Sequence, residues 1–412
     1  MSRSRDEEPY MGLARLYDEV RPDYPEMLFR DLVADVGWKK DTCILELGAG
    51  TGKATLPLAE RGCIIHALEP GTDMAEVFRE KTGRFPGITL DAVPFEQWDP
   101  KDNRLYEVIL CAQAFHWLDE EARLEKCRGL LREKGFLVLL FYSPVPWTDD
   151  RSQALNQELQ VILDRHVPRG KPGDKNDSKK SYGVQDAITE MKQDGMFELF
   201  MKREYRETVR NTPRQFLNAY KTVPALAAGL DALDEGTIQQ MDREREDVLA
   251  RHGGLPETAF DFTMLILRKK SLPVAPCGMD CTLCLGYQRS KNQCPGCNGP
   301  DIGKPEHCVK CSIRQCGIRL SSGNEFCVNC LDSPCRRLRE LDKRYRTRYG
   351  MSMLENLGTI RNEGIKAFMR GQAVKWTCPH CKSLLCVHRG KCLACGNKND
   401  HYPLDGQERM RT

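Results

Sequence analysis

The fold of the N-terminal part of the chain is decided by the stretch Leu45-Glu46-Leu47-Gly48-Ala49-Gly50-Thr51-Gly52. Residues 42–45 form a short apolar run that predicts a buried strand, and residues 53–61 carry apolar side chains at helical spacing. Because glycine has no Cβ, such a turn lets a ligand approach the backbone, and the first amides of the new helix face that ligand. The stretch therefore predicts a strand, a binding loop and a helix.

The glycine spacing distinguishes three kinds of ligand. A Walker loop needs Gly-x4-Gly-Lys-Ser/Thr, but Leu47 and Ala54 stand where the first glycine and the hydroxyl would be. The dinucleotide fingerprint needs a third glycine three residues after the second, where this sequence has Lys53. The remaining pattern, Gly-x-Gly-x-Gly preceded by Glu46, resembles the first motif of class I S-adenosylmethionine methyltransferases.

Composition divides the chain near residues 269–273. Four of the 20 Cys lie before residue 271, and the other 16 lie after it. Residues 1–270 carry 39 Lys and Arg against 47 Asp and Glu, a net charge of −8, whereas residues 271–412 carry 23 against 12, a net charge of +11. We therefore expect two domains, 1–270 and 271–412.

The N-terminal residues predict a cytoplasmic address. They lead into no apolar stretch of the kind found in a signal peptide, and no apolar run in the sequence reaches membrane-spanning length. We therefore expect no membrane partner. In a reducing cytosol, closely spaced Cys indicate metal or redox chemistry more than disulfides.

Apolar strands alternate with helices along residues 10–268, which predicts a doubly wound, mostly parallel α/β sheet covered on both faces. By analogy, the helices between residues 150 and 255 would form a lid, with a polar surface loop at 168–183. Ligands of such sheets bind at the carboxyl ends of the strands, where the strand order reverses. Strands are expected at residues 42–45, 63–68, 87–92, 106–112, 135–142, 202–209 and 260–268.

Glu69 ends the second of these strands and lies seventeen residues after Gly52. An acidic residue near this spacing accepts hydrogen bonds from the hydroxyls of a ribose. The alternative is a solvated carboxylate at a strand end. The glycine loop before it favours the ribose role. The glycine loop, Glu69, Phe95, Glu96 and Gln113 are all expected at the same rim of the sheet.

Residues 10–268 resemble class I methyltransferases of the broad type 11 group, which includes the trans-aconitate and cantharidin-acid carboxyl methyltransferases. The resemblance rests on residues 17–25, on the glycine stretch, on Glu69-Pro70 and on Ala112-Gln113-Ala114-Phe115-His116-Trp117. It implies a Rossmann-like sheet of seven strands, S-adenosyl-L-methionine as cofactor, and a small-molecule methyl acceptor, for which a carboxylate is one candidate.

The resemblance also implies roles for individual residues. The loop glycines would approach the methionine part of the cofactor, Glu69 would hold its ribose, and Phe95 and Glu96 would lie near its adenine. His116 and Trp117 would face the acceptor as catalytic candidates, with packing beneath the lid as the alternative. The full set of expected cofactor contacts is Tyr17, Arg21, Glu46, Gly48, Ala49, Gly50, Gly52, Glu69, Pro70, Phe95, Glu96 and Gln113.

Cysteine pairs of the form Cys-x2-Cys dominate the C-terminal part. Each pair presents two thiolates from one tight turn, and two pairs complete a tetrahedral metal site. Residues 376–396 contain two such pairs and predict a zinc-ribbon-like end. How the other Cys combine is left open by the sequence, and an iron–sulfur cluster is an alternative to zinc. The predicted metal ligands are Cys277, Cys281, Cys284, Cys294, Cys297, Cys308, Cys311, Cys316, Cys327, Cys330, Cys335, Cys378, Cys381, Cys386, Cys392 and Cys395.

Two other interpretations of this part are less favoured. Cys277-x3-Cys281-x2-Cys284 matches the radical S-adenosylmethionine spacing, but Leu283 replaces the usual aromatic residue and the remaining chain is short for the partial barrel. The basic run 336–348 is helix-compatible, and a solvated helix face is favoured over a nucleic-acid groove. Through residues 276–281, 341–345 and 386–392, the segment 276–396 instead resembles an uncharacterised prokaryotic cysteine-rich domain. This resemblance implies metal binding without a known activity.

The sequence therefore predicts a methyltransferase fused to a cysteine-rich zinc or iron–sulfur module, which would recognise the acceptor or a protein partner. The competing class is a metal-thiolate binding or redox protein whose first domain holds the cofactor without turning it over.

Overall fold

The structure is a computed structural model, and it describes residues 11–100, 104–167 and 182–403. Its contacts divide the chain into two compact units, which are described separately. Of the described residues, the first contains 11–100, 106–127, 134–167 and 182–268, and the second contains 104–105, 128–133 and 269–403. The surface loop expected at 168–183 lies outside the described residues except for its last two.

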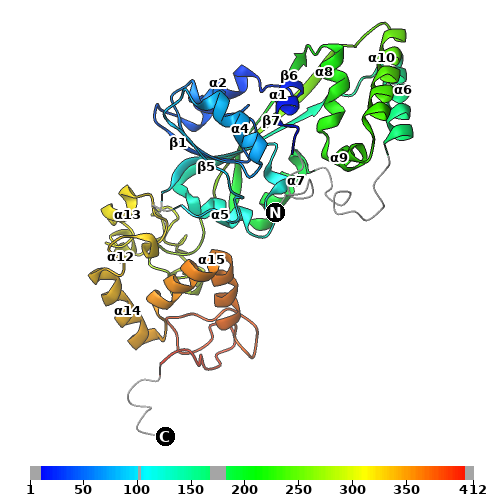
Figure 1. Cartoon of the computed structure of the whole chain (residues 1–412). Helices are drawn as coiled ribbons and strands as arrows, with labels where there is room; N and C mark the ends of the chain where they lie inside the picture. Colours follow the sequence, from blue (N-terminus) through cyan, green and yellow to red (C-terminus); the bar gives the residue numbers. More distant parts are fainter. Residues whose placement is uncertain (1–10, 101–103, 168–181, 404–412) are drawn as a thin grey trace, which may run out of the picture. The chain divides into compact units, whose positions relative to one another are not determined.

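One seven-stranded sheet with the order β3-β2-β1-β4-β5-β7-β6 forms the centre of the first unit (Figure 1). Strand β1 pairs in parallel with both β2 and β4, β2 pairs in parallel with β3, and β5 pairs antiparallel with β7. The predicted doubly wound, mostly parallel sheet is confirmed. Its strands are β1 (Cys43–Leu47), β2 (Ile64–Leu68), β3 (Ile88–Asp91), β4 (Tyr106–Ala112), β5 (Leu131–Pro144), β6 (Phe197–Val209) and β7 (Thr258–Lys269).

Helices cover the sheet because each presents an apolar stripe to it. From α2 (Glu26–Val36), Leu28, Phe29 and Leu32 pack with Ile44 of β1 and Val108 of β4 in one buried core. Helices α3 (Thr55–Ala59) and α4 (Thr72–Thr82) contribute further apolar residues to that side. Figure 1 shows α5 (Arg123–Leu130) and α7 (Val184–Asp194) on the opposite side. Helices thus lie on both sides of the sheet, whereas β6 at its edge is largely exposed.

A separate helical cluster lies in the region expected to form the lid. It comprises α6 (Asp150–His166), α8 (Pro213–Asn218), η2 (Ala219–Thr222), α9 (Pro224–Asp231) and α10 (Glu235–Arg251). These elements share an apolar core that includes Leu155, Leu159, Met241 and Val248. Pro224 starts α9 because its missing N–H is tolerated at a first helical position.

The second unit is built from short helical turns and two longer helices. These are α14 (Arg336–Tyr349) and α15 (Met353–Lys375), and α14 confirms the helix expected at 336–348. A kink at Gly364, with φ +88° and ψ 168°, divides α15 into two helical parts. The Asp342 carboxylate accepts hydrogen bonds from Ser352 Oγ at 2.7 Å and from Leu354 N at 3.0 Å, so it fixes the start of α15. The short elements are η3 (Cys281–Leu283), α11 (Leu285–Gln288), α12 (Glu306–Val309), α13 (Gly317–Ser321) and η4 (Cys327–Asn329).

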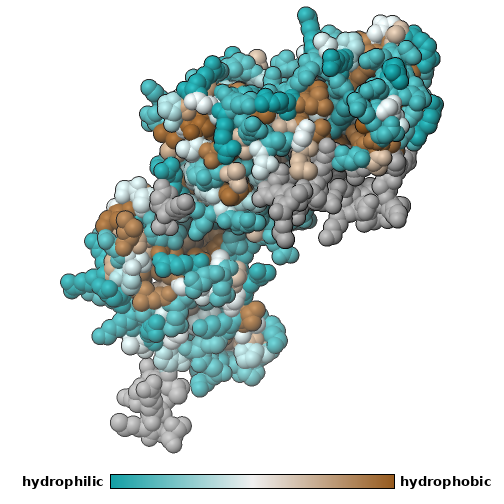
Figure 2. Space-filling view, viewed as in Figure 1, coloured by the Kyte–Doolittle hydropathy of each residue, from teal (hydrophilic) through white to brown (hydrophobic). Residues whose placement is uncertain are grey.

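Hydrophobic side chains on the visible face are interspersed among hydrophilic ones (Figure 2). Among the described residues, the most exposed large apolar side chains include Ile302 and Leu331 of the second unit, at 87% and 96%. The described helices include none that is both long enough and apolar enough to cross a bilayer.

Candidate cofactor site and metal centre

The glycine loop follows β1. It is packed against Ala114 at Gly48 and open at Gly50. All three glycines have positive φ angles, +65° at Gly48, +56° at Gly50 and +85° at Gly52, a conformation that favours glycine. A Cβ on Gly48 would lie 2.5 Å from the Ala114 Cβ, so this glycine allows the loops after β1 and β4 to touch. A Cβ on Gly50 would meet no atom within 4 Å. The loop therefore offers free space for a ligand at Gly50.

Glu69, at the end of β2, contacts this loop directly. The residue is 8% exposed, and its two carboxylate oxygens accept hydrogen bonds from Gly50 N and Gly71 N, both at 2.8 Å. Since β1 and β2 are parallel neighbours, their carboxyl ends bring the carboxylate and the loop together. The position suits the predicted ribose contact, which stays a prediction.

Glu46 lies one residue before the end of β1 and is 1% exposed. Thr55 Oγ1 donates a hydrogen bond to Glu46 Oε2 at 2.7 Å, whereas Oε1 has no hydrogen-bond partner among the described residues. Burial raises the pKa of the Glu46 carboxyl to about 8, and the nearby charge of Glu69 adds to the effect. A buried polar oxygen without a partner costs about 1–3 kcal/mol, so this site fits a ligand that brings a hydrogen-bonding group.

Gln113 follows β4 and has a φ of +55°, which is uncommon for a residue other than glycine. Its backbone N–H donates to Leu140 O at 2.9 Å, and its side-chain Nε2 donates to Tyr142 O at 2.6 Å. These two bonds to β5 hold the strained residue in place. Such conformations concentrate at functional sites, where the surroundings fix them.

Helix α1 (Ala14–Val20) is tied to the loop and to the helical cluster. Asp18 Oδ1 accepts a hydrogen bond from Thr51 Oγ1 at 2.6 Å. The same oxygen forms an ion pair with Lys81 Nζ at 2.5 Å. Arg21, next to the helix, donates to Thr222 O at 2.6 Å and stacks its guanidinium 5.4 Å from the Tyr17 ring centroid. The role of Asp18 is not apparent from the sequence, because its partners lie 33 and 63 residues away.

Phe95 and Glu96 contact the segments around α5. Phe95 is buried, its carbonyl accepts a hydrogen bond from Lys126 Nζ at 2.5 Å, and that ammonium lies 4.8 Å from the ring centroid. Burial lowers the pKa of Lys126. Glu96 Oε1 accepts from Asp119 N at 2.9 Å. Their predicted position near an adenine stays a prediction.

His116 and Trp117 lie in η1 (Phe115–Trp117), and their ring centroids are 4.9 Å apart. Arg123, which is 2% exposed, supports this turn by donating to Phe115 O at 2.8 Å. The same guanidinium forms two hydrogen bonds with Glu190 at 2.8 and 2.6 Å. The half-buried His116 and Trp117 are therefore held after β4, on the same connection as Gln113.

The Cys-x2-Cys pairs of the predicted ribbon come together in the second unit. The ligand atoms of Cys378, Cys381, Cys392 and Cys395 all lie within 4.8 Å of one another, the only such group among the described residues. The Cys378–Cys395 and Cys381–Cys392 sulfur pairs are both 3.7 Å apart. Four thiolates around zinc at about 2.3 Å would be about 3.8 Å apart, so these residues fit a tetrahedral zinc ion.

Comparison with known proteins shows what part of the first unit is similar to. Residues 44–135 match the family model described as "Methyltransferase domain". An uncharacterised methyltransferase of Schizosaccharomyces pombe is 30% identical over 145 residues, which are 34% of this chain and 56% of that protein. An uncharacterised methyltransferase of Mycobacterium bovis is 28% identical over 152 residues, 36% of this chain and 59% of that protein. The chain thus spans little more than half the length of these curated relatives.

Among solved structures, a Geobacter sulfurreducens S-adenosylmethionine-dependent methyltransferase in complex with S-adenosylhomocysteine is 15% identical. The match covers 61% of this chain and 93% of that one, with a TM-score of 0.35.

The first unit thus combines a seven-stranded, mostly parallel sheet with a segment, residues 44–135, that is similar to methyltransferase domains. The domain match covers the glycine loop, Glu69, Gln113 and η1.

Proposed function

We propose that the whole chain is an S-adenosylmethionine-dependent methyltransferase that acts on a small-molecule acceptor and carries a zinc module in its second unit. The observation that supports this proposal best is the open face of the glycine loop at Gly50, with the Glu69 carboxylate bonded to the amide of the same residue. The proposed domains are 1–270 and 271–412, and the cytoplasmic address stays a prediction of the sequence.

The residues present fit the cofactor by their chemistry. Gly50 leaves room for close approach to the backbone, Glu69 offers an acceptor for hydroxyl groups, and Glu46 has a buried oxygen without a partner. We propose that these three residues hold its methionine and ribose parts, and that Tyr17 and Arg21 contact it from the side of α1. When bound, S-adenosylmethionine supplies a methyl group activated by a sulfonium.

The protein's contribution to methyl transfer is alignment and exclusion of water. In-line displacement needs the acceptor atom about 3–3.5 Å from the methyl carbon, which a rigid site can provide without a general base. An anionic acceptor such as a carboxylate loses charge as it attacks a sulfonium, so a water-poor site favours the transition state. We propose that His116 and Trp117 face the acceptor. Arg123 holds their turn in place through its hydrogen bond to Phe115 O.

The zinc module is proposed from the ribbon set. Ser383, which lies between Cys381 and Cys386, hydrogen bonds to Cys381 and lowers the pKa of that thiol to about 6, so a thiolate forms readily there. Because this module is fused to the first unit, we propose that it contacts the acceptor or a protein partner.

The experiment that tests the function is a methyl-transfer screen with the full chain. The protein is incubated with S-adenosylmethionine labelled in its methyl group and with fractions of small metabolites, and labelled products are identified by mass spectrometry. We expect label in a carboxylate ester or another small product, and Gly50→Ala as the inactive control. Cofactor binding without any labelled product would favour the alternative, a metal-thiolate protein with a non-catalytic cofactor domain. A His116→Ala variant with an unchanged rate and pH profile would exclude a base role for His116.

A further inference from the structure

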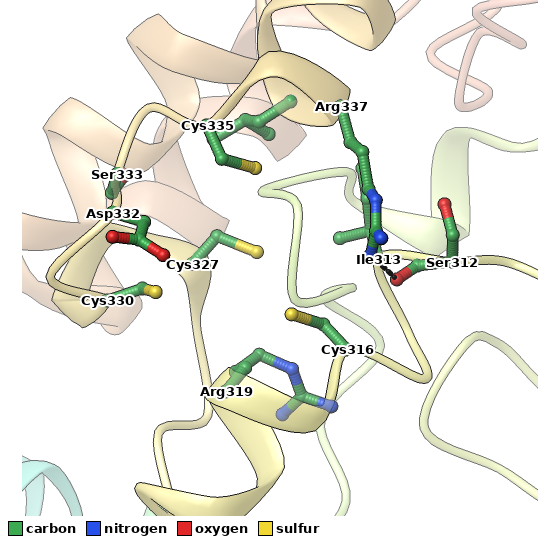
Figure 3. A pocket seen from close by; sticks show the side chains of 11 residues that line it. Ser312, Ile313, Cys316, Arg319, Cys327, Cys330, Asp332, Ser333, Cys335 and Arg337 are labelled. Atoms are coloured by element: carbon green, nitrogen blue, oxygen red, sulfur yellow. Dashed lines mark hydrogen bonds between the residues drawn. The ribbon is translucent and has the colours of Figure 1, made fainter.

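Four Cys outside the ribbon set surround a small cavity in the second unit. Cys316, Cys327, Cys330 and Cys335 line a space of about 30 Å³. In Figure 3 the sulfur atoms of Cys316, Cys327 and Cys335 face one another, and Cys330 points toward the same space. About 10–15 Å³ is enough to hold one water molecule. The space therefore suits a single ion better than a cluster of several irons and sulfides.

The backbone holds these four side chains on three segments. Cys327 and Cys330 belong to the tight turn of η4, in which Cys330 N donates to Cys327 O at 3.2 Å. Cys316 directly precedes α13. Cys335 is the N-cap of α14, a helix of 14 residues whose N-terminal dipole favours a thiolate. Two helix starts and one tight turn therefore bring together four Cys that lie up to 19 residues apart in the sequence.

Arg319 lines the same cavity and is 4% exposed. Its two Nη atoms donate to Asn324 O and Arg314 O, both at 2.8 Å, whereas its Nε has no hydrogen-bond partner among the described residues. A buried donor left unpaired costs about 1–3 kcal/mol. A thiolate would accept this hydrogen bond, and four thiolates on one divalent ion carry a net charge of −2 that Arg319 and Arg337, which also lines the cavity, would offset.

We propose that Cys316, Cys327, Cys330 and Cys335 form a second zinc site, separate from the ribbon set and independent of the proposed methyl transfer. Among the described residues, only the sulfurs of the ribbon set all lie within 4.8 Å of one another. The sulfurs of the second set would therefore move closer together when they bind the ion. Zinc is favoured over iron because four thiolates around one small space match its tetrahedral structural sites. Binding would convert the four thiols to thiolates and release their protons to solvent.

The test is the zinc content of the full chain by native mass spectrometry after reconstitution with zinc. We expect Cys316→Ser and Cys378→Ser each to lose one zinc ion, and the double variant to lose two. Cys43→Ser, a change in β1 of the first unit, is the matched control and should keep the full content. A Cys316→Ser protein with unchanged zinc content would overturn the proposal, as would a double variant that loses no more than either single variant.

A second measurement covers the case in which a variant does not fold. Alkylation of the unaltered full chain is mapped by peptide mass spectrometry while a chelator is titrated. The four Cys are expected to be protected in the zinc-loaded protein and to become reactive together. Free reaction of all four in the zinc-loaded protein, or visible absorption of an iron–sulfur cluster that depends on these Cys, would contradict a zinc site here.

Discussion

Asp18 of α1 accepts a hydrogen bond from Thr51 of the glycine loop at 2.6 Å, and the same oxygen pairs with Lys81 of α4 at 2.5 Å. Burial opposes ionisation of Asp18, but the hydrogen bonds from Lys81 and Thr51 outweigh it and lower the pKa of this carboxyl. One carboxylate therefore holds three segments together at the side of the proposed cofactor site.

Removing this carboxylate should weaken cofactor binding. We expect Asp18→Ala to raise the Kd for S-adenosylmethionine about tenfold, which corresponds to about 1.4 kcal/mol, because α1 loses its bond to the loop. Isothermal titration of the full chain measures the change. The control is Glu80→Ala, which breaks an exposed ion pair between Arg15 and Glu80 that joins the same two helices. Equal effects of both changes would contradict a specific role for Asp18.

Gly50→Ala separates a ligand clash from backbone strain. A Cβ at Gly50 meets no protein atom within 4 Å, and the same is true of Gly37, which ends α2 with a φ of +66°. Both changes place alanine in the left-handed region at a cost of about 1–2 kcal/mol. We expect similar losses of thermal stability from the two variants but a loss of cofactor binding only in Gly50→Ala. If Gly50→Ala binds as the unaltered protein does, the loop does not hold the cofactor.

Glu46 predicts a pH dependence of stability. Burial raises the pKa of Glu46 from its ordinary value of 4.5 to about 8, so between these values the folded protein holds a proton that the unfolded chain has lost. Raising the pH through this range therefore removes stability. Glu46→Gln, which cannot ionise, should lose less stability between pH 5 and pH 8 than the unaltered protein, as followed by thermal unfolding at each pH. Parallel curves for the two proteins, with Glu60→Gln as an exposed control, would show that Glu46 ionises normally.

Arg123 should contribute more to the free energy of unfolding than an exposed arginine in a similar ion pair. Its side chain is 1% exposed, and losing one partner of a buried pair typically costs about 3–5 kcal/mol. Arg206 pairs with Asp261 at the surface, where such pairs contribute below about 1 kcal/mol. We expect urea unfolding to rank Arg123→Met well below Arg206→Met in stability. Similar free energies of unfolding would mean that η1 is supported by other contacts.

The elements of the sheet could be predicted from the sequence because buried parallel strands are apolar runs between turns. All seven expected strands are present, but β5 begins at Leu131 rather than at 135, and β6 begins at Phe197 rather than at 202. The additional residues of β5 are largely charged, as in Arg132-Glu133-Lys134, so the apolar pattern does not include them, and those of β6 are mostly exposed. Strand ends are therefore not defined by the apolar pattern alone.

The candidate sites could be predicted from the sequence only where their residues lie close together along the chain. The glycine loop and Glu69 are separated by one short helix and strand β2, and their spacing identifies them. The ribbon pairs are also close in sequence, and the structure brings them together. Asp18 and the grouping of Cys316 with Cys335 depend on contacts between segments, which spacing alone does not define.

The most direct test of the central claim is titration of S-adenosylmethionine into the full chain, followed by the same titration of Glu69→Ala and of the exposed control Glu60→Ala. We expect the unaltered protein and the control to bind one equivalent with the same Kd, and Glu69→Ala to bind at least about tenfold more weakly. No binding by the unaltered chain, or equal binding by Glu69→Ala, would contradict the account of this site.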